Sequence, residues 1–489
     1  MKYFSTRNSD LTVSGAEAIV RGLAPDGGLF VPDAFPEVSL AEINELCKKD
    51  YRGRAASIME KYLPEFTADE IKGFVCAAYG DNFDCKDTAP LHFLDDGTAV
   101  LELWHGPTCA FKDMALQMLP HLLTASLRKC GETREVCILV ATSGDTGKAA
   151  LEGFADVPGT RIMVFYPRDG VSDVQKLQMV TQRGGNVNVC SVKGNFDDAQ
   201  TGVKKIFSDK DFAKELSENG VFLSSANSIN WGRLLPQIAY YFSAYCDYVN
   251  SGIIKTGDLI DFAVPTGNFG NILAGYYAKQ MGLPVRKLIC CSNENKVLTD
   301  FLTTGVYDKN RKFFTTISPS MDILVSSNLE RLLYSVCRDD REVAGYMAEL
   351  SGKGCYTAGE SIMSVLRESF AAGFCTDAEA KKVIGDVWSE KHYLMDTHTA
   401  VAYKVYAEQR DGTPTVVVST ASPFKFCDSV LDALGEKTDA PGTELIGRLS
   451  EFTGIASPAP LSGLDRREVR FTGCAEKSEM KNAVAEFLK

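Results

Sequence analysis

The sequence has no long apolar run and no excess of positive charge. No segment approaches the ~18 consecutive apolar residues that a membrane-spanning helix needs, and the first residues, Met1 to Arg7, contain no apolar signal region. The net charge is −12, which argues against a nucleic acid or an anionic membrane surface as the main partner. We therefore expect neither of these partners, although the charge balance leaves room for a local basic pocket that binds an anionic metabolite.

Patterns typical of disulfides and metal sites are also missing. The 15 cysteines are scattered, odd in number and contain no C-x-x-C pair, a usage typical of free thiols in a reducing compartment. No two of the five histidines stand at a metal-ligand spacing, so we predict no metal site. These absences together predict a soluble, cytoplasmic protein.

The composition that is present is that of a large globular enzyme or binding protein. The 489 residues are 45% hydrophobic and 24% charged, enough for large cores and a length typical of roughly three domains. Residues 1–95 are predicted to form a mainly helical N-terminal domain. Ser39 with Glu42, and Thr67 with Glu70, each have the capping-box spacing that begins a helix.

From residue 96 the pattern alternates between short apolar strands and helices. Strands are predicted at 99–104, 135–141, 161–166, 186–192, 259–264, 288–291 and 415–418. Helices are predicted at 114–119, 148–154, 171–182, 197–207 and 272–280, with a packed, tyrosine-rich helix over 236–249. This alternation predicts an α/β fold with two parallel sheets, each covered by helices, and a cleft between them.

Lys112 stands between the first of these strands and the helix that follows it. Gly106-Pro107 breaks the strand, and Ala110 and Phe111 precede the lysine. An amine at such a junction is partly desolvated and near a helix N-terminus, and both effects disfavour its ammonium form. Lys112 is therefore a candidate nucleophile or base, and the alternative is an ordinary surface lysine.

The residues around Lys112 form a recognisable motif. His105-Gly106-Pro107-Thr108, followed by Ala110 to Asp113, resembles the cofactor-lysine motif of the threonine synthase family in its long bacterial and fungal form. The resemblance implies that Lys112 is the catalytic, Schiff-base lysine that carries pyridoxal 5'-phosphate. Such a site also needs a phosphate cradle and a partner for the ring nitrogen.

The loop Thr142 to Lys148 lies between a strand and a helix and is rich in hydroxyls and glycine. Backbone N–H groups at a helix N-terminus bind anions. A nucleotide P-loop is the competing interpretation, but Thr142 and Ala149 stand where that motif needs Gly and Ser or Thr. The resemblance implies that the substrate binds Thr142, Ser143, Gly144 and Thr146 and that Asp145 lies at the cofactor, and it implies no role for Lys148.

A second glycine-rich loop, Pro265 to Asn271, also joins a strand to a helix. Glycine lets the backbone approach an anion closely, and the helix dipole favours a phosphate there. The loop matches the family's cradle for the cofactor phosphate, which implies cofactor binding by five residues: Gly267, Asn268, Phe269, Gly270 and Asn271.

Three further matches complete the predicted site. Thr420, at the end of the last apolar strand, matches the residue that hydrogen-bonds the ring nitrogen. Asn227 and Arg233 supply an amide and a guanidinium suited to a substrate phosphate. The chain departs from the family at Ser422, where histidine is usual, and at Phe424, where alanine is usual. His398 is predicted to be a buried structural residue.

The resemblance covers nearly the whole chain and implies a pyridoxal-phosphate enzyme of fold type II. The implied domains are 1–95 (helical), 96–130 (first part of the large cofactor domain), 131–225 (small α/β domain) and 226–489 (the remainder of the large domain, with a C-terminal appendage). The implied enzyme is a carbon–oxygen lyase acting on phosphates. It converts O-phospho-L-homoserine and water into L-threonine and phosphate by γ-elimination and β-addition.

Other functions stay open at this stage. A phospholyase on the same scaffold would give 2-oxobutyrate from the same substrate. A cofactor-binding protein without catalysis would have no use for the substrate loops, and a nucleotide-dependent enzyme is disfavoured by the failed P-loop. The expected partner is a small-molecule substrate, and the protein is expected to be a monomer or a homo-oligomer.

Overall fold

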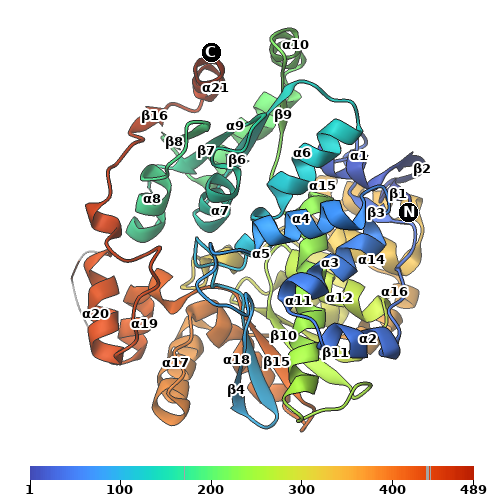
Figure 1. Ribbon diagram of the computed structural model, residues 1–489, viewed down its shortest axis with the longest axis vertical. Coiled ribbons are helices and arrows are strands. Elements are labelled where there is room, and N and C mark those ends of the chain that lie inside the picture. The colour runs from blue at the N-terminus through green and yellow to red at the C-terminus, as the bar shows by residue number, and fades with distance from the viewer. Residues whose placement is uncertain (170, 437–439, 441) are drawn as a thin grey trace.

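In a computed structural model, which describes residues 1–169, 171–436, 440 and 442–489, the chain folds around two sheets of mainly parallel strands (Figure 1). The predicted α/β class is therefore confirmed. In the part of the chain that the structure describes, none of the helices combines the length and the apolar character that crossing a bilayer requires. The division into the four predicted domain segments stays a prediction.

The larger sheet has six strands, and all but the last are parallel. Their order is β14 (Phe370–Phe374), β11 (Val285–Ser292), β10 (Ile260–Pro265), β15 (Thr415–Ser419), β5 (Thr98–Glu102) and β4 (Leu91–Asp95). Every residue of β10 and β15 is buried, as expected for strands covered on both faces. The carboxyl ends of β10, β15 and β5 meet at one edge of this sheet.

Alternate residues of the central strands enter two different cores. Phe262 and Val264 pack in the core that contains α11 (Trp231–Asn250) and α12 (Gly270–Gln280). Ala263 points the other way and packs with α18 (Thr397–Gln409) and α17 (Asp377–Lys391). Because successive side chains of a strand point to opposite faces of the sheet, one apolar strand contacts the helices on both sides. The tyrosine-rich helix predicted over 236–249 is α11.

The smaller sheet has five parallel strands. Their order is β16 (Gly473–Ala475), β8 (Val187–Val192), β7 (Thr160–Pro167), β6 (Glu135–Ala141) and β9 (Val221–Ser224). The helices of this part are α7 (Asp145–Phe154), α8 (Asp173–Val180), α9 (Phe196–Ser208), α10 (Lys210–Glu218) and α21 (Met480–Leu488). The C-terminal segment thus returns to this sheet as its edge strand (Figure 1).

The N-terminal region combines a small sheet with helices. β1 (Tyr3–Ser5), β2 (Asn8–Val13) and β3 (Phe30–Pro32) are antiparallel. The helices are α1 (Gly15–Arg21), α2 (Leu40–Cys47), α3 (Tyr51–Tyr62) and α4 (Ala68–Ala78). The capping boxes predicted at Ser39 and Thr67 are confirmed at the starts of α2 and α4.

The remaining elements surround the large sheet. They are α13 (Val297–Thr304), β12 (Val306–Asp308), α14 (Leu329–Cys337), α15 (Asp340–Gly352), β13 (Cys355–Thr357), α16 (Glu360–Ser369), α19 (Cys427–Ala433) and α20 (Glu444–Thr453). β12 and β13 pair with each other as an antiparallel two-stranded sheet.

Two predicted helices near the site differ from the structure. The helix predicted at 114–119 is split into α5 (Asp113–Leu116) and α6 (Leu119–Lys129), because Pro120 has no N–H to donate to the carbonyl of Leu116. The helix predicted to begin at Lys148 begins at Asp145. The strand predicted to reach residue 104 ends at Glu102.

Candidate active site

Loops from both sheets come together beside Lys112. The segment after β5 runs along the segment after β15: the Phe111 N–H donates to the Thr420 carbonyl at 2.8 Å, and the Ser422 N–H donates to the Cys109 carbonyl at 3.0 Å. These backbone hydrogen bonds fix Lys112, the residue before α5, close to Thr420. The two predicted cofactor residues are therefore held by neighbouring parallel strands.

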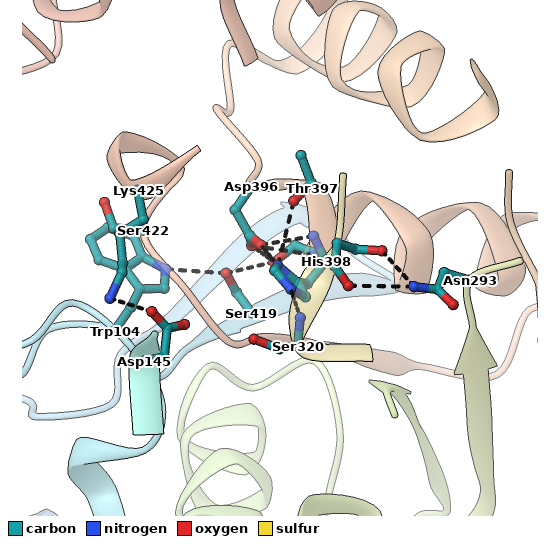
Figure 2. Close-up of polar contacts among 12 residues, drawn as sticks. Trp104, Asp145, Asn293, Ser320, Asp396, Thr397, His398, Ser419, Ser422 and Lys425 are labelled. Atoms are coloured by element: carbon teal, nitrogen blue, oxygen red, sulfur yellow. Dashed lines mark hydrogen bonds and ion pairs between the residues drawn. The ribbon is translucent and has the colours of Figure 1, made fainter. Parts of the chain in front are cut away.

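The small sheet contributes Asp145, the first residue of α7, to the same place. Its Oδ2 lies 3.8 Å from Lys112 Nζ. Its Oδ1 accepts hydrogen bonds from Lys425 Nζ at 2.8 Å and from Gln175 Nε2 at 2.8 Å. Figure 2 shows the contact between Lys425 and Asp145. Burial would raise the pKa of Asp145, but the Lys425 and Lys112 ammonium groups hold it well below its usual range.

Lys112 itself is largely buried, with 11% of its side chain exposed. Burial lowers the pKa of its amine to about 8. The nearby Asp145 carboxylate opposes this shift, and the Lys425 and Arg233 cations add to it. Roughly a tenth of Lys112 is therefore unprotonated at pH 7, far more than for an ordinary lysine, and the free amine is the form that a base or a nucleophile requires.

The acid that follows Lys112 in the sequence is occupied elsewhere. The two oxygens of Asp113 accept from the Thr108 N–H at 2.8 Å and from the Thr108 hydroxyl at 2.7 Å. Burial raises the pKa of Asp113 to about 7, although both Thr108 contacts lower it. Asp113 therefore shapes the loop that precedes Lys112 and is not its counterion.

The predicted substrate loop forms a tight turn before α7. The Thr142 hydroxyl accepts the N–H groups of Gly144 at 3.0 Å and Gly147 at 2.9 Å, so it organises the turn. Gly144 has φ 146°, where a side chain would be strained. Within the described residues, the hydroxyls of Ser143 and Thr146 have no protein partner. They are the side chains that this loop leaves available to a ligand.

The predicted phosphate loop is tied to the chain around residue 327. Phe269, in the left-handed region with φ 63°, ends the loop directly before α12. The Ser326 hydroxyl donates to the Gly267 carbonyl at 2.7 Å. The backbone and side-chain amides of Asn328 donate to the Asn268 carbonyl at 3.1 and 3.0 Å. With its carbonyls held by these donors, the loop can turn N–H groups of a helix N-terminus toward an anion.

Asn271, in the first turn of α12, carries an unpaired buried donor. Its Oδ1 accepts hydrogen bonds from the hydroxyls of Tyr240 at 2.6 Å and Tyr241 at 2.8 Å. Its Nδ2 is buried and has no hydrogen-bond partner in the part of the chain that the structure describes. A buried amide without an acceptor is costly unless a ligand supplies one. The two tyrosines therefore orient this amide as a donor beside the phosphate loop.

Arg233, in α11, is the other under-satisfied donor of the site. The residue is 3% exposed. Its Nη1 donates to the Ala226 carbonyl at 2.9 Å, and its Nε is buried with no acceptor among the residues that the structure describes. Burial lowers the pKa of this guanidinium to about 10. The Asn227 side chain has no protein partner among the described residues. A buried cation that is not paired with a carboxylate can bind an anionic ligand such as a phosphate.

Comparison with known proteins agrees with this arrangement. Three family models match: "Threonine synthase N terminus" over residues 2–79, "Pyridoxal-phosphate dependent enzyme" over 98–421 and "Threonine synthase, C-terminal" over 399–486. The threonine synthase of Saccharomyces cerevisiae is 36% identical, over 99% of this chain and 98% of its own length. This chain belongs to the threonine synthase family. It also belongs to the family of pyridoxal-phosphate dependent enzymes.

Two further proteins that resemble this chain are a solved bacterial structure and a human protein. The "PLP bound" threonine synthase structure from Brucella melitensis has a TM-score of 0.89 and 38% identity, over 100% of both chains. The human protein named "Threonine synthase-like 1" is 42% identical over 86% of this chain. This chain spans 58% of the length of that relative.

The residues present fit the family's cofactor. Pyridoxal phosphate needs an amine, a cradle for its phosphate and a hydrogen-bonding group for its ring nitrogen. Lys112, the glycine-rich loop with the unpaired Nδ2 of Asn271, and the Thr420 hydroxyl, which has no protein partner among the described residues, can supply these three. We name them as the residues that would hold the cofactor.

The departures from the family pattern have local structural roles. Ser422 is fully buried, and its hydroxyl accepts the Phe424 N–H at 3.3 Å at the start of η2 (Pro423–Lys425). The Phe424 ring packs into the core. Lys148 binds Glu152 at 2.6 Å and also contacts Gln182, so it takes no part in the contacts around Lys112.

His398 is buried, as predicted, and both of its ring nitrogens have hydrogen-bond partners. Its Nδ1 lies 2.9 Å from Asp396 Oδ1, and its Nε2 accepts the Ser320 N–H at 3.2 Å. Figure 2 shows this chain of contacts from Asp396 to Ser320. Ser320 in turn packs its carbonyl against Gly267, so the histidine supports the phosphate loop from behind.

Gly267 can be tested through this packing. A Cβ at position 267 would lie 2.6 Å from the Ser320 carbonyl oxygen, so Gly267→Ala must shift the loop. We expect the affinity of the apoprotein for pyridoxal phosphate to fall at least about tenfold, measured by fluorescence titration. Gly345→Ala, on α15 with no atom within 4 Å of the added Cβ, is the matched control. Equal affinity in the two variants would contradict the assignment.

His105, in the motif before Lys112, is clamped between two acids. Its Nδ1 lies 2.6 Å from Asp84 and its Nε2 lies 2.8 Å from Glu102. Burial alone would lower its pKa, but the two carboxylates raise it to about 9. The structure thus holds a protonated histidine in the loop that leads to Lys112.

This clamp predicts a pH dependence of stability. Because the folded pKa of His105 lies above the unfolded value of about 6.5, its stabilisation is complete below pH ~6.5 and is lost as the pH rises through about 9. The difference in unfolding free energy between wild type and His105→Gln, from urea titrations, should be largest near pH 6 and shrink at high pH. Burial lowers the pKa of His121, so the difference in unfolding free energy between wild type and His121→Gln should not shrink at high pH. If the difference in unfolding free energy between wild type and His105→Gln did not change with pH, the claim that Asp84 and Glu102 stabilise a protonated His105 would be wrong.

Proposed function

We propose that this chain converts O-phospho-L-homoserine and water into L-threonine and phosphate. The observation that carries the proposal is the buried guanidinium of Arg233. Its positive charge acts on the Lys112 amine, and no carboxylate among the described residues pairs with it. A base beside an anion site suits a substrate whose phosphate lies near the carbon that loses a proton. Membership of the threonine synthase family supports this choice.

The residues divide the work by their chemistry. Bound pyridoxal phosphate supplies an aldehyde for the substrate amine and a ring that delocalises the charge left at carbon. Lys112, with its lowered pKa, accepts that proton and returns it. Thr420 would hydrogen-bond the ring nitrogen, and Asp145 would lie beside the ring as a carboxylate.

Substrate recognition would use the donors that the protein leaves unpaired. The Ser143 and Thr146 hydroxyls, with the backbone of Gly144, would bind the substrate carboxylate, and Thr142 would hold that loop in shape. Arg233 and the Asn227 amide would bind the substrate phosphate. As phosphate leaves, its growing charge is stabilised by a guanidinium that is already in place and desolvated.

A product assay tests the proposal. Purified protein supplied with pyridoxal phosphate and O-phospho-L-homoserine should release threonine and phosphate in equal amounts. Phosphate released with 2-oxobutyrate and ammonia would show a phospholyase, and absence of turnover would show a binding protein. Either result would overturn the proposal.

We propose a reducing, cytoplasmic location for this activity. All 15 cysteines are free thiols, and several are buried in the cores, where oxidation would disturb packing. This cysteine usage is typical of reducing compartments.

A further inference from the structure

Lys425 is a buried lysine that contacts Asp145, the acid that faces Lys112. Its side chain is 0% exposed. It donates to Asp145 Oδ1 at 2.8 Å and to the Thr108 carbonyl at 2.9 Å. In this position it cannot reach the solvent, and its two contacts connect the loop before Lys112 to the start of α7. Figure 2 shows the contact with Asp145.

The oxygens of Asp145 are unequally shared. Oδ1 is within hydrogen-bond distance of Lys425 and of Gln175. Oδ2 faces Lys112 Nζ at 3.8 Å, which is too long for a hydrogen bond. The carboxylate is therefore neutralised first by Lys425, and no carboxylate among the described residues lies within hydrogen-bond distance of Lys112.

The other charged groups that face Lys112 do not change this balance. Arg233 approaches from α11 and disfavours the Lys112 ammonium, as Lys425 does. Asp113, on α5, has both oxygens filled by Thr108. Lys425 also lowers the pKa of Asp113, but within the described residues Asp145 is the one carboxylate acting on Lys112 that Lys425 contacts.

We propose that Lys425 is a positioning residue whose ammonium fixes and neutralises the Asp145 carboxylate, so that Lys112 keeps a free amine. Without Lys425, Asp145 would become the counterion of Lys112 and stabilise its ammonium form. The inference rests on Lys112 being the proton-transferring lysine of the proposed function. Its test measures the amine directly and needs neither substrate nor turnover.

The test is competitive labelling of the full-length apoprotein with trace acetic anhydride between pH 6 and pH 11. Mass spectrometry of the Lys112 peptide gives the midpoint of amine deprotonation, which we expect near 8 in the wild type. In Lys425→Met the midpoint should rise by at least about one pH unit, a tenfold change in the protonation ratio. An unchanged midpoint overturns the proposal. Lys425→Gln, which keeps a donor for the Thr108 carbonyl, gives the same measurement if the Met variant does not fold.

Two further variants separate this role from a general charge effect. Lys148→Met removes another buried lysine, one that binds Glu152, and should leave the Lys112 midpoint unchanged. In an Asp145→Asn background, Lys425→Met should raise the midpoint much less than it does with Asp145 present, since the acid that it controls is gone. An equal rise in both backgrounds would show that Lys425 acts on Lys112 directly and would overturn the positioning role. If the midpoints shift as expected but the product assay yields no threonine, the proposed reaction is wrong and the positioning role of Lys425 still stands.

Discussion

Replacing Lys112 by alanine is expected to lower the turnover of O-phospho-L-homoserine by at least about a thousandfold, in the range that a positioned general base contributes. The reason is geometric, because the other lysine close to Asp145 is Lys425. Its side chain is fully buried and held by two hydrogen bonds, so it cannot take over the proton transfer. The measurement is kcat/KM from phosphate release, with bound cofactor followed by its absorbance.

The matched control for this prediction is Lys148→Met. Lys148 is also buried, and also belongs to the segment around α7, but it binds Glu152 and Gln182. We expect it to keep kcat/KM close to the wild-type value. If Lys112→Ala retained more than about a tenth of wild-type turnover, the role given to Lys112 would be wrong.

Replacing Arg233 by methionine is expected to lower kcat/KM for O-phospho-L-homoserine by at least about a hundredfold. Removal of one buried partner of a charge pair costs roughly 2–5 kcal/mol, and the substrate phosphate would lose such a partner. In the protein without ligands the same change removes a buried charge that is largely unpaired. We therefore expect the melting temperature of the apoprotein to stay constant or rise.

Arg331 provides the contrasting case. It is fully buried as well, but its guanidinium donates to the carbonyls of Phe30 at 3.0 Å and Ile229 at 2.6 Å and to the Asn328 side chain at 2.7 Å. Arg331→Met should therefore lower the melting temperature, since it leaves buried acceptors unpaired. If Arg233→Met destabilised the apoprotein as Arg331→Met does, Arg233 would be structural and not a ligand-binding residue.

Much of the fold could be predicted because its strands are apolar runs bounded by turn residues. The run at 135–141 is found as β6 at the same residues, since a strand buried on both faces shows its limits directly in the sequence. Helix ends were less predictable. The start of α7 at Asp145 depends on the Thr142 hydroxyl, which accepts two N–H groups of the turn. A contact of this kind is not encoded in periodicity.

The candidate site was only partly predictable for a similar reason. Lys112 and the two glycine-rich loops lie in short local motifs, so a resemblance could identify them. Lys425 lies far from Asp145 in the sequence, and no spacing rule joins them. The sequence around Lys425 did contain an indication. A cation between Phe424 and Phe426, shortly after a buried strand, is expected to be buried and to need a partner inside the protein.

The supporting hydroxyls of Tyr240 and Tyr241 were also missed. Their helical spacing predicted a packed face, and both rings are buried as expected. Their second function, as donors to Asn271, depends on how α11 crosses α12. Only the tertiary structure shows that crossing.

The most direct test of the account is borohydride reduction of the purified protein loaded with pyridoxal phosphate, followed by peptide mapping. Reduction fixes the cofactor permanently to the amine that carries it. We predict that the label is found on the peptide that contains Lys112. A label on any other lysine, or no label after loading, would contradict the central claim.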